Sequence, residues 1–265
     1  MSLIKILTYN MYLLPPGIGG RNGAFKTERL YEFIHFYMQN YDIICLQEVF
    51  GMFSKRLDIL INAAKEYNYY IVTKKHSILE WPIFPIDSGL VILSRFPIKD
   101  VGFCAFPRGS HADMFAQKGI LYCKIQIDNQ LINIYNLHMQ AQEYKEIRKI
   151  QLQTLCNYIK PNFPTIICGD FNIAFNNIEY NILKNAMYSI DKNAKNTLQS
   201  VNNYCNMLYS SGIQNGNEEL IDYIWLLFNN NISIKESTIK TFPSKSIHYN
   251  QLSDHNAICT TINFM

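Results

Sequence analysis

Eight polar residues stand at the ends of short apolar runs that are spread along the chain. They are Asn10 after ILTY, Glu48 after ICLQ, His138 after INIYNL, Asp170 and Asn172 in CGDFN, Asp222 in ELIDYIW, and Asp254 and His255 in LSDHNA. Because loops at strand ends carry side chains to a shared site, we expect these residues to converge. Carboxylate and amide oxygens without cysteine are the ligand set of a hard cation, Mg²⁺ before Zn²⁺. The two histidines are left for proton transfer and charge stabilisation.

Most of these motifs, taken singly, have an ordinary structural explanation. Asn10 fits a turn, His138 fits a hydrogen-bonded core histidine, and the GDFN and SDH segments fit a tight turn and a helix N-cap. Glu48 after an apolar run is harder to explain, because a buried carboxylate is costly unless it is paired or bound to metal. Asp222 inside an apolar strand raises the same difficulty. The conjunction of all the motifs, each at a strand end, favours one catalytic site.

Short β-branched runs predict the strands that must position these residues. The predicted strands cover residues 4–9, 41–46, 69–72, 89–93, 120–127, 131–137, 165–168, 221–227 and 257–262. The turn-rich residues 128–130 between two of these runs predict a hairpin and hence antiparallel pairing. Apolar residues at helical spacing predict helices near 30–38 and 147–159. Hairpins with intervening helices indicate an α/β fold with more than one sheet. Because no repeat or long linker interrupts the pattern, we expect a single domain over residues 1–265.

Composition narrows the class of protein. The chain has 265 residues, of which 48% are hydrophobic and 17% charged, as in ordinary globular proteins. A net charge of +3 is too small to indicate a dedicated nucleic-acid binder, so a nucleic-acid partner is not expected. The seven cysteines include no CxxC pair and predict free thiols. The N-terminus has neither a signal peptide nor a membrane span, so we expect a cytoplasmic or peripheral membrane location, with non-classical export left open.

The ordered motifs TYN, LQE, NLH, GDFN, IDY and SDH resemble the signature of the endonuclease/exonuclease/phosphatase superfamily. The resemblance runs from residue 10 to residue 255, which is nearly the whole chain. It implies a four-layered α/β/β/α sandwich, with two packed mixed or antiparallel sheets and the active site at one end of them. It also implies a metal-dependent phosphodiesterase or phosphatase.

The resemblance implies a role for each motif in binding the metal and the phosphate. Glu48, assisted by Asn10, would hold Mg²⁺, for which Mn²⁺ could substitute. Asp170 and Asn172 would contact the attacking water and the phosphoryl oxygens. His138 would stabilise charge on the phosphate. The physical logic is that an anionic phosphodiester repels nucleophiles until a cation neutralises it.

Proton transfer is implied for the last motifs in the chain. His255 would act as general base or proton shuttle, and Asp222 would orient it. Asp254 would lie close to the metal. These roles fit the need for a positioned base that activates water.

Three stretches resemble the neutral sphingomyelinases within this superfamily. NMYLLP is similar to their NxxxLP, HMQA is similar to their HLQA, and Asp113 precedes Lys118 and Gly119 at the family's spacing. The resemblance implies that Asp113 and Lys118 form a substrate-gated pair and that sphingomyelin is hydrolysed to ceramide and phosphocholine. The alternative for Asp113 and Lys118 is a surface ion pair, worth about 0–1 kcal/mol.

Other members of the superfamily fit less well. Inositol polyphosphate 5-phosphatases resemble one another through GDxNYR and CDR elements, whereas this chain has GDFNIA and IDYIWL. A DNase or an abasic-site endonuclease would need a broader basic stripe. A binding module that had lost its chemistry would lack catalytic positions, and none is missing here.

A phospholipid substrate implies contact with a membrane surface. Residues 77–88, SILEWPIFPIDS, carry Trp81, Ile83, Phe84 and Ile86. Trp and aliphatic side chains next to lysines suit the headgroup region, so we expect this segment to dip into it. A buried connector is the alternative.

Overall fold

Two six-stranded sheets carry the fold in the part of the chain that the computed structural model describes, residues 3–19, 23–74, 85–141, 144–160, 162–175, 177–196, 220–228 and 232–264. The first sheet has the order β11-β12-β1-β2-β4-β3 and consists of β1 (Leu3–Leu13), β2 (Ile43–Val49), β3 (Tyr70–Thr73), β4 (Val91–Ser94), β11 (Ile232–Lys240) and β12 (Ala257–Phe264). The second has the order β5-β6-β7-β8-β10-β9 and consists of β5 (Ile98–Ala105), β6 (Gly119–Ile127), β7 (Gln130–His138), β8 (Thr165–Asp170), β9 (Lys195–Asn196) and β10 (Asp222–Leu227).

Each sheet is mixed, with one parallel pair at its centre. β1 pairs in parallel with β2, and β7 pairs in parallel with β8. The other pairs in the two sheets are antiparallel. A parallel pair needs a crossover connection, and each of these contains helix. The parallel pairs bring the carboxyl ends of four central strands to the same end of the two sheets.

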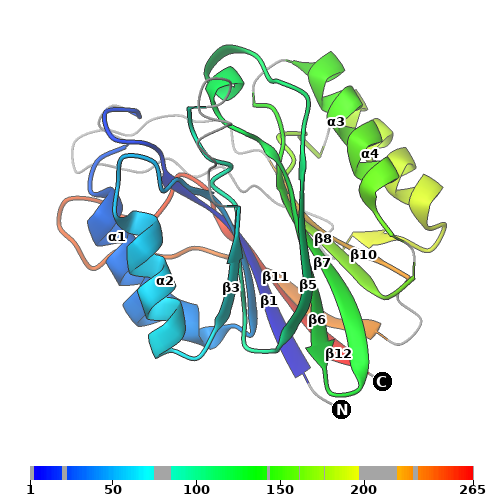
Figure 1. The fold of residues 1–265 in the computed structure, drawn as a ribbon, viewed down its shortest axis with the longest axis horizontal. Helices are drawn as coiled ribbons and strands as arrows, with labels where there is room; N and C mark the ends of the chain where they lie inside the picture. Colours follow the sequence, from blue (N-terminus) through cyan, green and yellow to red (C-terminus); the bar gives the residue numbers. More distant parts are fainter. Residues whose placement is uncertain are drawn as a thin grey trace.

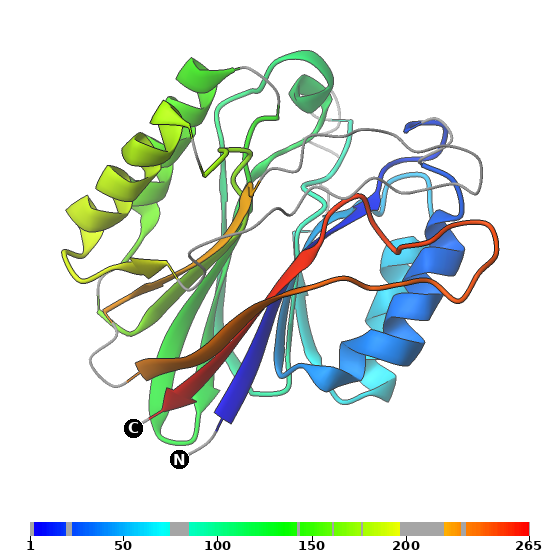
Figure 2. The same cartoon turned by 180° about the vertical axis from the view of Figure 1, so that it is seen from behind.

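Helices cover the outer face of each sheet (Figures 1 and 2). On the first sheet lie α1 (Lys26–Glu32), a π-helical turn η1 (Phe33–Tyr37), a 3₁₀ turn η2 (Met38–Asn40) and α2 (Arg56–Glu66). On the second lie α3 (Lys145–Tyr158) and α4 (Ile178–Ile190). The short 3₁₀ turn η3 (His111–Phe115) belongs to the loop before β6. The layers follow one another as α/β/β/α, as the family resemblance implies.

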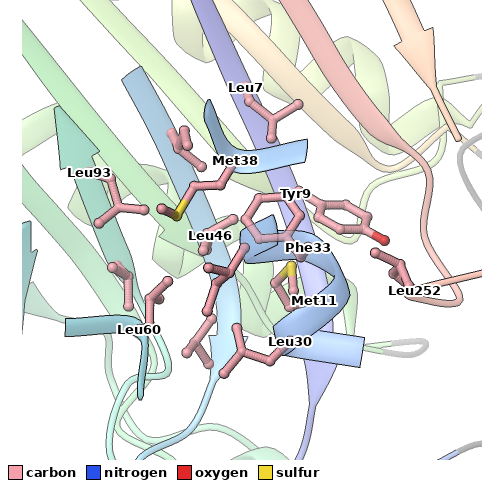
Figure 3. Packing of buried hydrophobic residues seen from close by; sticks show 14 of the residues in the cluster. Leu7, Tyr9, Met11, Leu30, Phe33, Met38, Leu46, Leu60, Leu93 and Leu252 are labelled. Atoms are coloured by element: carbon pink, nitrogen blue, oxygen red, sulfur yellow. The ribbon is translucent and has the colours of Figure 1, made fainter. Parts of the chain in front are cut away.

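Three hydrophobic cores fill the spaces between these layers. Leu7, Tyr9, Phe33, Leu46 and Leu60 pack between the first sheet and its helices (Figure 3). Isoleucine, leucine and cysteine side chains fill the space between the sheets. A third cluster, rich in aromatic residues, lies between the second sheet and α3 and α4. Because successive strand residues face opposite sides, each central strand contributes to two cores at once.

The structure confirms all nine predicted strands and the hairpin, which is the antiparallel pair β6–β7. Both predicted helices are present, at Lys26–Asn40 as one run of turns and at Lys145–Tyr158. The pattern missed α2, α4 and the strands β5, β9 and β11. β5 and β11 are edge strands with several exposed positions. Their sequences therefore lack the buried run that marks an inner strand.

The predictions about cysteines, membrane spans and the apolar segment 77–88 have different outcomes. The six cysteines that the structure describes are free thiols, as expected. Among the described residues, no helix has the length and apolar character needed to span a bilayer. Trp81, Ile83 and Phe84 lie outside the described residues. Ile86 is half-buried and forms a parallel bridge with Ala116, in the loop between Asp113 and Lys118.

Candidate active site

Side chains alternate between the two faces of each inner strand, and this alternation places residues of β7 and β8 in the site. On β7, Ile132 and Ile134 face the core between the sheets, and the same face continues to His138 at the strand end. On β8 the facing residues end in Asp170 in the same way. The register pairs His138 with Asp170, and Asp170 with Asp222 on β10. Three neighbouring strands of the second sheet thus end in three predicted site residues.

The first sheet supplies a second group at the same end. Asn10 lies on β1 and Glu48 near the end of the adjacent β2. The Asn10 side-chain amide donates to Glu48 Oε1 at 3.1 Å and to Asp170 Oδ2 at 3.0 Å. Its own Oδ1 accepts from the Tyr12 backbone amide at 3.0 Å. Asn10 therefore holds the Glu48 carboxylate in place and links the two sheets.

Two site residues have a left-handed backbone conformation that residues other than glycine rarely adopt. Glu48 has φ 58° and Asn172 has φ 52°. Asn172 donates its backbone amide to Asp170 Oδ1 at 2.9 Å and its side-chain amide to Met139 O at 3.1 Å. Left-handed backbone at non-glycine residues is concentrated at functional sites, because only the surrounding structure can hold it.

His255 and Asp222 form a buried pair that suits proton transfer. His255 Nδ1 lies 2.8 Å from Asp222 Oδ2, and its Nε2 lies 3.8 Å from Asp170 Oδ2. Burial raises the pKa of Asp222 to about 6, although His255 opposes the shift. Burial lowers the pKa of His255, but Asp222, Asp170 and Asp254 outweigh it and raise that pKa well above its usual value. A nearby cation would lower the His255 pKa and make the imidazole available as a base.

His138 is buried and held neutral. Burial, Lys118 and His255 lower the pKa of His138 well below its usual value. Its Nε2 lies 3.0 Å from Lys118 Nζ, which can only donate, so Nε2 accepts and the proton sits on Nδ1. The Nε2 atom also lies 3.6 Å from Asp170 Oδ2. The Nε2 edge of the ring therefore faces the centre of the site. Lys118 contacts this nitrogen, which is the atom that we expect to contact a phosphate.

Asp113 and Lys118 form an ion pair at 2.8 Å, in which Lys118 is buried and Asp113 is half-buried. Lys118 also donates to Met139 O at 2.7 Å, and Asp113 Oδ2 accepts from the Ala141 amide at 2.8 Å. The pair thus joins the loop before β6 to the segment that follows His138. A surface ion pair, which was the alternative, does not describe this arrangement.

Asp254 lies beside the group, half-buried, and its pKa is raised by burial. It accepts from the Ser253 hydroxyl at 3.3 Å, and the same hydroxyl donates to Asn10 O at 2.6 Å. Sequence reasoning missed Ser253, and also the Met139 carbonyl that binds both Lys118 and Asn172. The position of Ser253 inside the SDH motif was a usable signal. A backbone carbonyl leaves no signal in the sequence.

Glu48 is the best position for a cation among the described residues. Its Oε2 atom is buried and has no hydrogen-bond partner there, and burial followed by repulsion from Asp254 raises the pKa of Glu48 to about 7. Asp170, Asp222 and His255 also offer ligand atoms within 4.8 Å of one another. Asp222 and His255 are already bonded to each other, however, so the unpaired Glu48 oxygen fits a cation better. Unpaired buried carboxylate oxygen is a costly arrangement that a bound cation would relieve.

Metal binding at Glu48 is expected to depend on pH, because a proton competes with the metal for the carboxylate. With a pKa of about 7, the half-saturating Mg²⁺ concentration should rise about tenfold from about pH 8 to about pH 6 and change little above pH 8. Calorimetric titration across this range measures it. Glu48→Gln serves as the control, since it should bind weakly and lose most of the pH dependence. Equal affinity at both pH values would place the metal elsewhere.

Comparison with known proteins identifies the family. The model of the endonuclease/exonuclease/phosphatase family matches residues 7–255. A sphingomyelinase of Dictyostelium discoideum is 31% identical over 174 residues, which are 51% of this chain and 38% of that protein. Sphingomyelinase C of Bacillus cereus is 31% identical over 200 residues, covering 67% of this chain and 59% of that protein. The match thus spans about half the length of these curated relatives.

Solved structures share the fold. Beta toxin from Staphylococcus aureus has a TM-score of 0.78 at 21% identity, over 97% of this chain and 99% of that one, and another structure of that toxin contains bound magnesium ions. TDP2 from D. rerio, complexed with a single-stranded DNA product, has a TM-score of 0.69 at 15% identity, over 99% of this chain and 100% of that one. The family match covers nearly all of the chain and includes each of the eight polar residues, so the chain belongs to the endonuclease/exonuclease/phosphatase family.

Proposed function

We propose that this protein is a Mg²⁺-dependent phosphodiesterase that hydrolyses sphingomyelin to ceramide and phosphocholine. The observation that carries the choice of substrate is the Asp113–Lys118 pair, whose buried lysine is held against His138. The similarity to sphingomyelinases from two distant organisms supports it. We also propose that residues 1–265 act as one catalytic domain, for which the family match over 7–255 is the support.

Glu48, whose carboxylate Asn10 holds, would bind the metal, which would supply charge neutralisation at the phosphate and stabilisation of the leaving oxygen. His255 Nε2 takes a proton from the attacking water. Asp222 fixes the ring through Nδ1 and stabilises the imidazolium that forms. Asp170 lies between the two histidines and can orient the water.

Charge that develops on the phosphoryl oxygens needs donors that are already in position. Asn172 offers its side-chain amide, which Met139 O holds near the site. Lys118 brings a positive charge to the same place, but in this structure it is bound to Asp113 and lies against His138. Substrate would have to displace Lys118 from His138 Nε2, because this nitrogen must carry a proton to donate to a phosphoryl oxygen and cannot do so while it accepts from Lys118. The Asp113–Lys118 pair then acts as a gate that an appropriate substrate opens.

The proposed substrate lies in a bilayer, so the enzyme would meet it at a membrane surface as a peripheral protein. Ile86 is the described member of the apolar segment 77–88 that we expect to dip into the headgroup region. It donates its backbone amide to Phe115 O at 3.0 Å and accepts from the Gln117 amide at 3.1 Å. The segment is thus bonded directly to the loop between Asp113 and Lys118, which supports a link between lipid contact and the gate.

A substrate panel tests the proposal. Purified protein in Mg²⁺ is given sphingomyelin vesicles, supercoiled DNA and a phosphoinositide. We expect phosphocholine release that EDTA and Glu48→Gln abolish. Asp113→Ala should reduce it roughly tenfold or more, because the loop that carries Lys118 loses its anchor at Ala141. Asp58→Ala, an exposed aspartate on α2, is the control and should leave the rate unchanged.

The second candidate is a DNA phosphodiesterase or phosphoinositide phosphatase with the same constellation. The fold shared with TDP2, whose solved structure contains a DNA product, is the observation in its favour. Nicking of DNA or phosphate release that needs Glu48 but is indifferent to Asp113 would select this candidate and reject sphingomyelin.

A further inference from the structure

A buried polar bridge crosses the space between the two sheets, which apolar side chains otherwise fill. Gln47 Nε2 donates to Asn136 Oδ1 at 2.7 Å and lies 3.1 Å from Thr8 Oγ1. Asn136 donates its amide to Leu46 O and to Val91 O, both at 2.9 Å. Thr8, Gln47 and Asn136 are each fully buried. Asn136 belongs to β7 of the second sheet, whereas all its partners named here belong to the first.

The bridge lies one layer below the site. Thr8 precedes Asn10 by two residues on β1, and Gln47 precedes Glu48 on β2. Asn136 precedes His138 by two residues on the same face of β7. Thr8 and Asn136 therefore each stand one layer beneath a site residue of their own strand, and Gln47 is the chain neighbour of Glu48. This proximity suggests a role in the site rather than in the core alone.

The active site needs such a bridge because it is assembled from two sheets. Asn10 and Glu48 come from the first sheet, and His138, Asp170 and Asp222 from the second. Apolar contacts are not directional and tolerate small shifts of one sheet over the other. Hydrogen bonds of 2.7–2.9 Å hold direction as well as distance. A displacement of about 1 Å at a catalytic site can lower turnover about 100-fold.

The polar bridge also has a cost that an apolar core would avoid. Gln47 Oε1 is buried and, among the described residues, has no hydrogen-bond partner. Buried polar groups that are incompletely bonded destabilise a fold relative to apolar side chains of the same shape. We propose that Gln47 and Asn136 are positioning residues that fix the metal-binding group of the first sheet relative to His138 of the second. This inference rests on the proposed phosphodiesterase function only in so far as its test measures kcat.

Asn136→Leu is the first variant to measure, with Asn133→Leu as its matched control. Asn133 is equally buried on the same strand, but it contacts Tyr122 and Thr165 within the second sheet and lies far from the strand end. Asn136→Leu should lower kcat about 10- to 100-fold while KM and the half-saturating Mg²⁺ concentration stay within about twofold. Asn133→Leu should lose thermal stability without a change in kcat.

A double variant separates positioning from folding. Gln47→Met with Asn136→Leu replaces both amides by apolar chains of similar size, which should restore part of the Tm that either single change loses. If the bridge positions the site, kcat stays low although Tm recovers. Recovery of kcat together with Tm, or a kcat for Asn136→Leu within twofold of the Asn133→Leu value, would overturn the proposal.

A readout that needs no substrate keeps this test apart from the proposed function. Crystal structures supply it: in the double variant the distance from Glu48 Oε1 to His138 Nε2, which is 3.9 Å in the wild type, should change by about 1 Å. In Asn133→Leu this distance should match the wild type. An unchanged distance in the double variant would reject the bridge. An inactive wild type on sphingomyelin would reject only the substrate.

Discussion

His255→Ala is expected to lower kcat by about 10²- to 10⁴-fold, the range for loss of a general base. His255 is buried, is oriented by Asp222 at 2.8 Å and faces Asp170, and among the described residues no other histidine has this combination. His138 is not a substitute, because its Nε2 atom contacts Lys118 and its pKa is lowered. Steady-state rates in saturating Mg²⁺ measure the effect on whichever phosphodiester the protein hydrolyses.

His35→Ala is the matched control, since His35 is exposed on the outer layer and stacks on Tyr31. Its rate should equal that of the wild type. Because the change leaves Asp222 buried without this partner, the His255→Ala protein should also lose stability, and circular dichroism must show that it is folded at the assay temperature. Near-full activity of folded His255→Ala would rule out this residue as the base for any substrate.

Glu179→Ala is expected to lower the free energy of unfolding by about 3–5 kcal/mol, because it breaks a buried ion pair by removing one partner. Arg148 on α3 donates to Glu179 Oε1 at 2.6 Å and to Oε2 at 2.8 Å, and both side chains are buried. Without Glu179 the guanidinium would remain buried with its charge uncompensated at that position. Urea or thermal unfolding followed by circular dichroism measures the loss.

Glu146→Ala provides the comparison, because Glu146 is exposed on the same helix and should change stability by less than about 0.5 kcal/mol. The double change of Arg148→Met and Glu179→Leu should recover most of the loss, since apolar side chains of similar volume can replace a buried pair. A Glu179→Ala protein as stable as Glu146→Ala would contradict the burial of the pair.

The ion pair also matters for the site. Arg148 donates a third hydrogen bond, to Gln140 O at 3.0 Å, and the Gln140 side chain accepts from the Ser110 amide at 2.9 Å. A Cβ on Gly109 would lie 2.5 Å from Gln140 Oε1, so a larger residue there would displace the Gln140 side chain. Through these contacts α3 and α4 hold the loop that carries Asp113. We therefore expect loss of the Arg148–Glu179 pair to disturb the Asp113–Lys118 pair more than it disturbs Glu48.

The sequence was most informative where a polar residue ends an apolar strand. Asp222 and Glu48 could not be explained as surface residues, and the structure buries Asp222 fully and pairs it with His255. Asn10, Glu48, Asp170 and His138 likewise meet within one hydrogen-bonded group. Strand periodicity predicts this for Asn10, His138 and Asp170, which continue the face of their strands that lies between the sheets. Glu48 has the parity of Ile44 and Leu46, which face the helices, and its left-handed backbone interrupts that alternation.

The sequence was least informative at the sheet edges. β5 and β11 were missed because edge strands need no buried face, and their exposed positions read as loop. The helices α2 and α4 were also missed, although both carry buried apolar residues. Their apolar residues were not distinguished in the sequence from those of the neighbouring turns. The number of sheets, and the number of strands in each, depend on pairings between segments far apart in the chain, such as β1 with β12.

By itself, the sequence determined the family motifs, the α/β class and the set of polar residues that share one site. Only the tertiary structure decided that Lys118 is buried against His138 and that Gln47 bonds to Asn136 across the sheets. The same holds for the Glu48 oxygen that has no hydrogen-bond partner in the described part of the chain. The physical reason is that motif identity is local, whereas burial, charge balance and inter-sheet contact join residues about 20 to 90 positions apart in the chain.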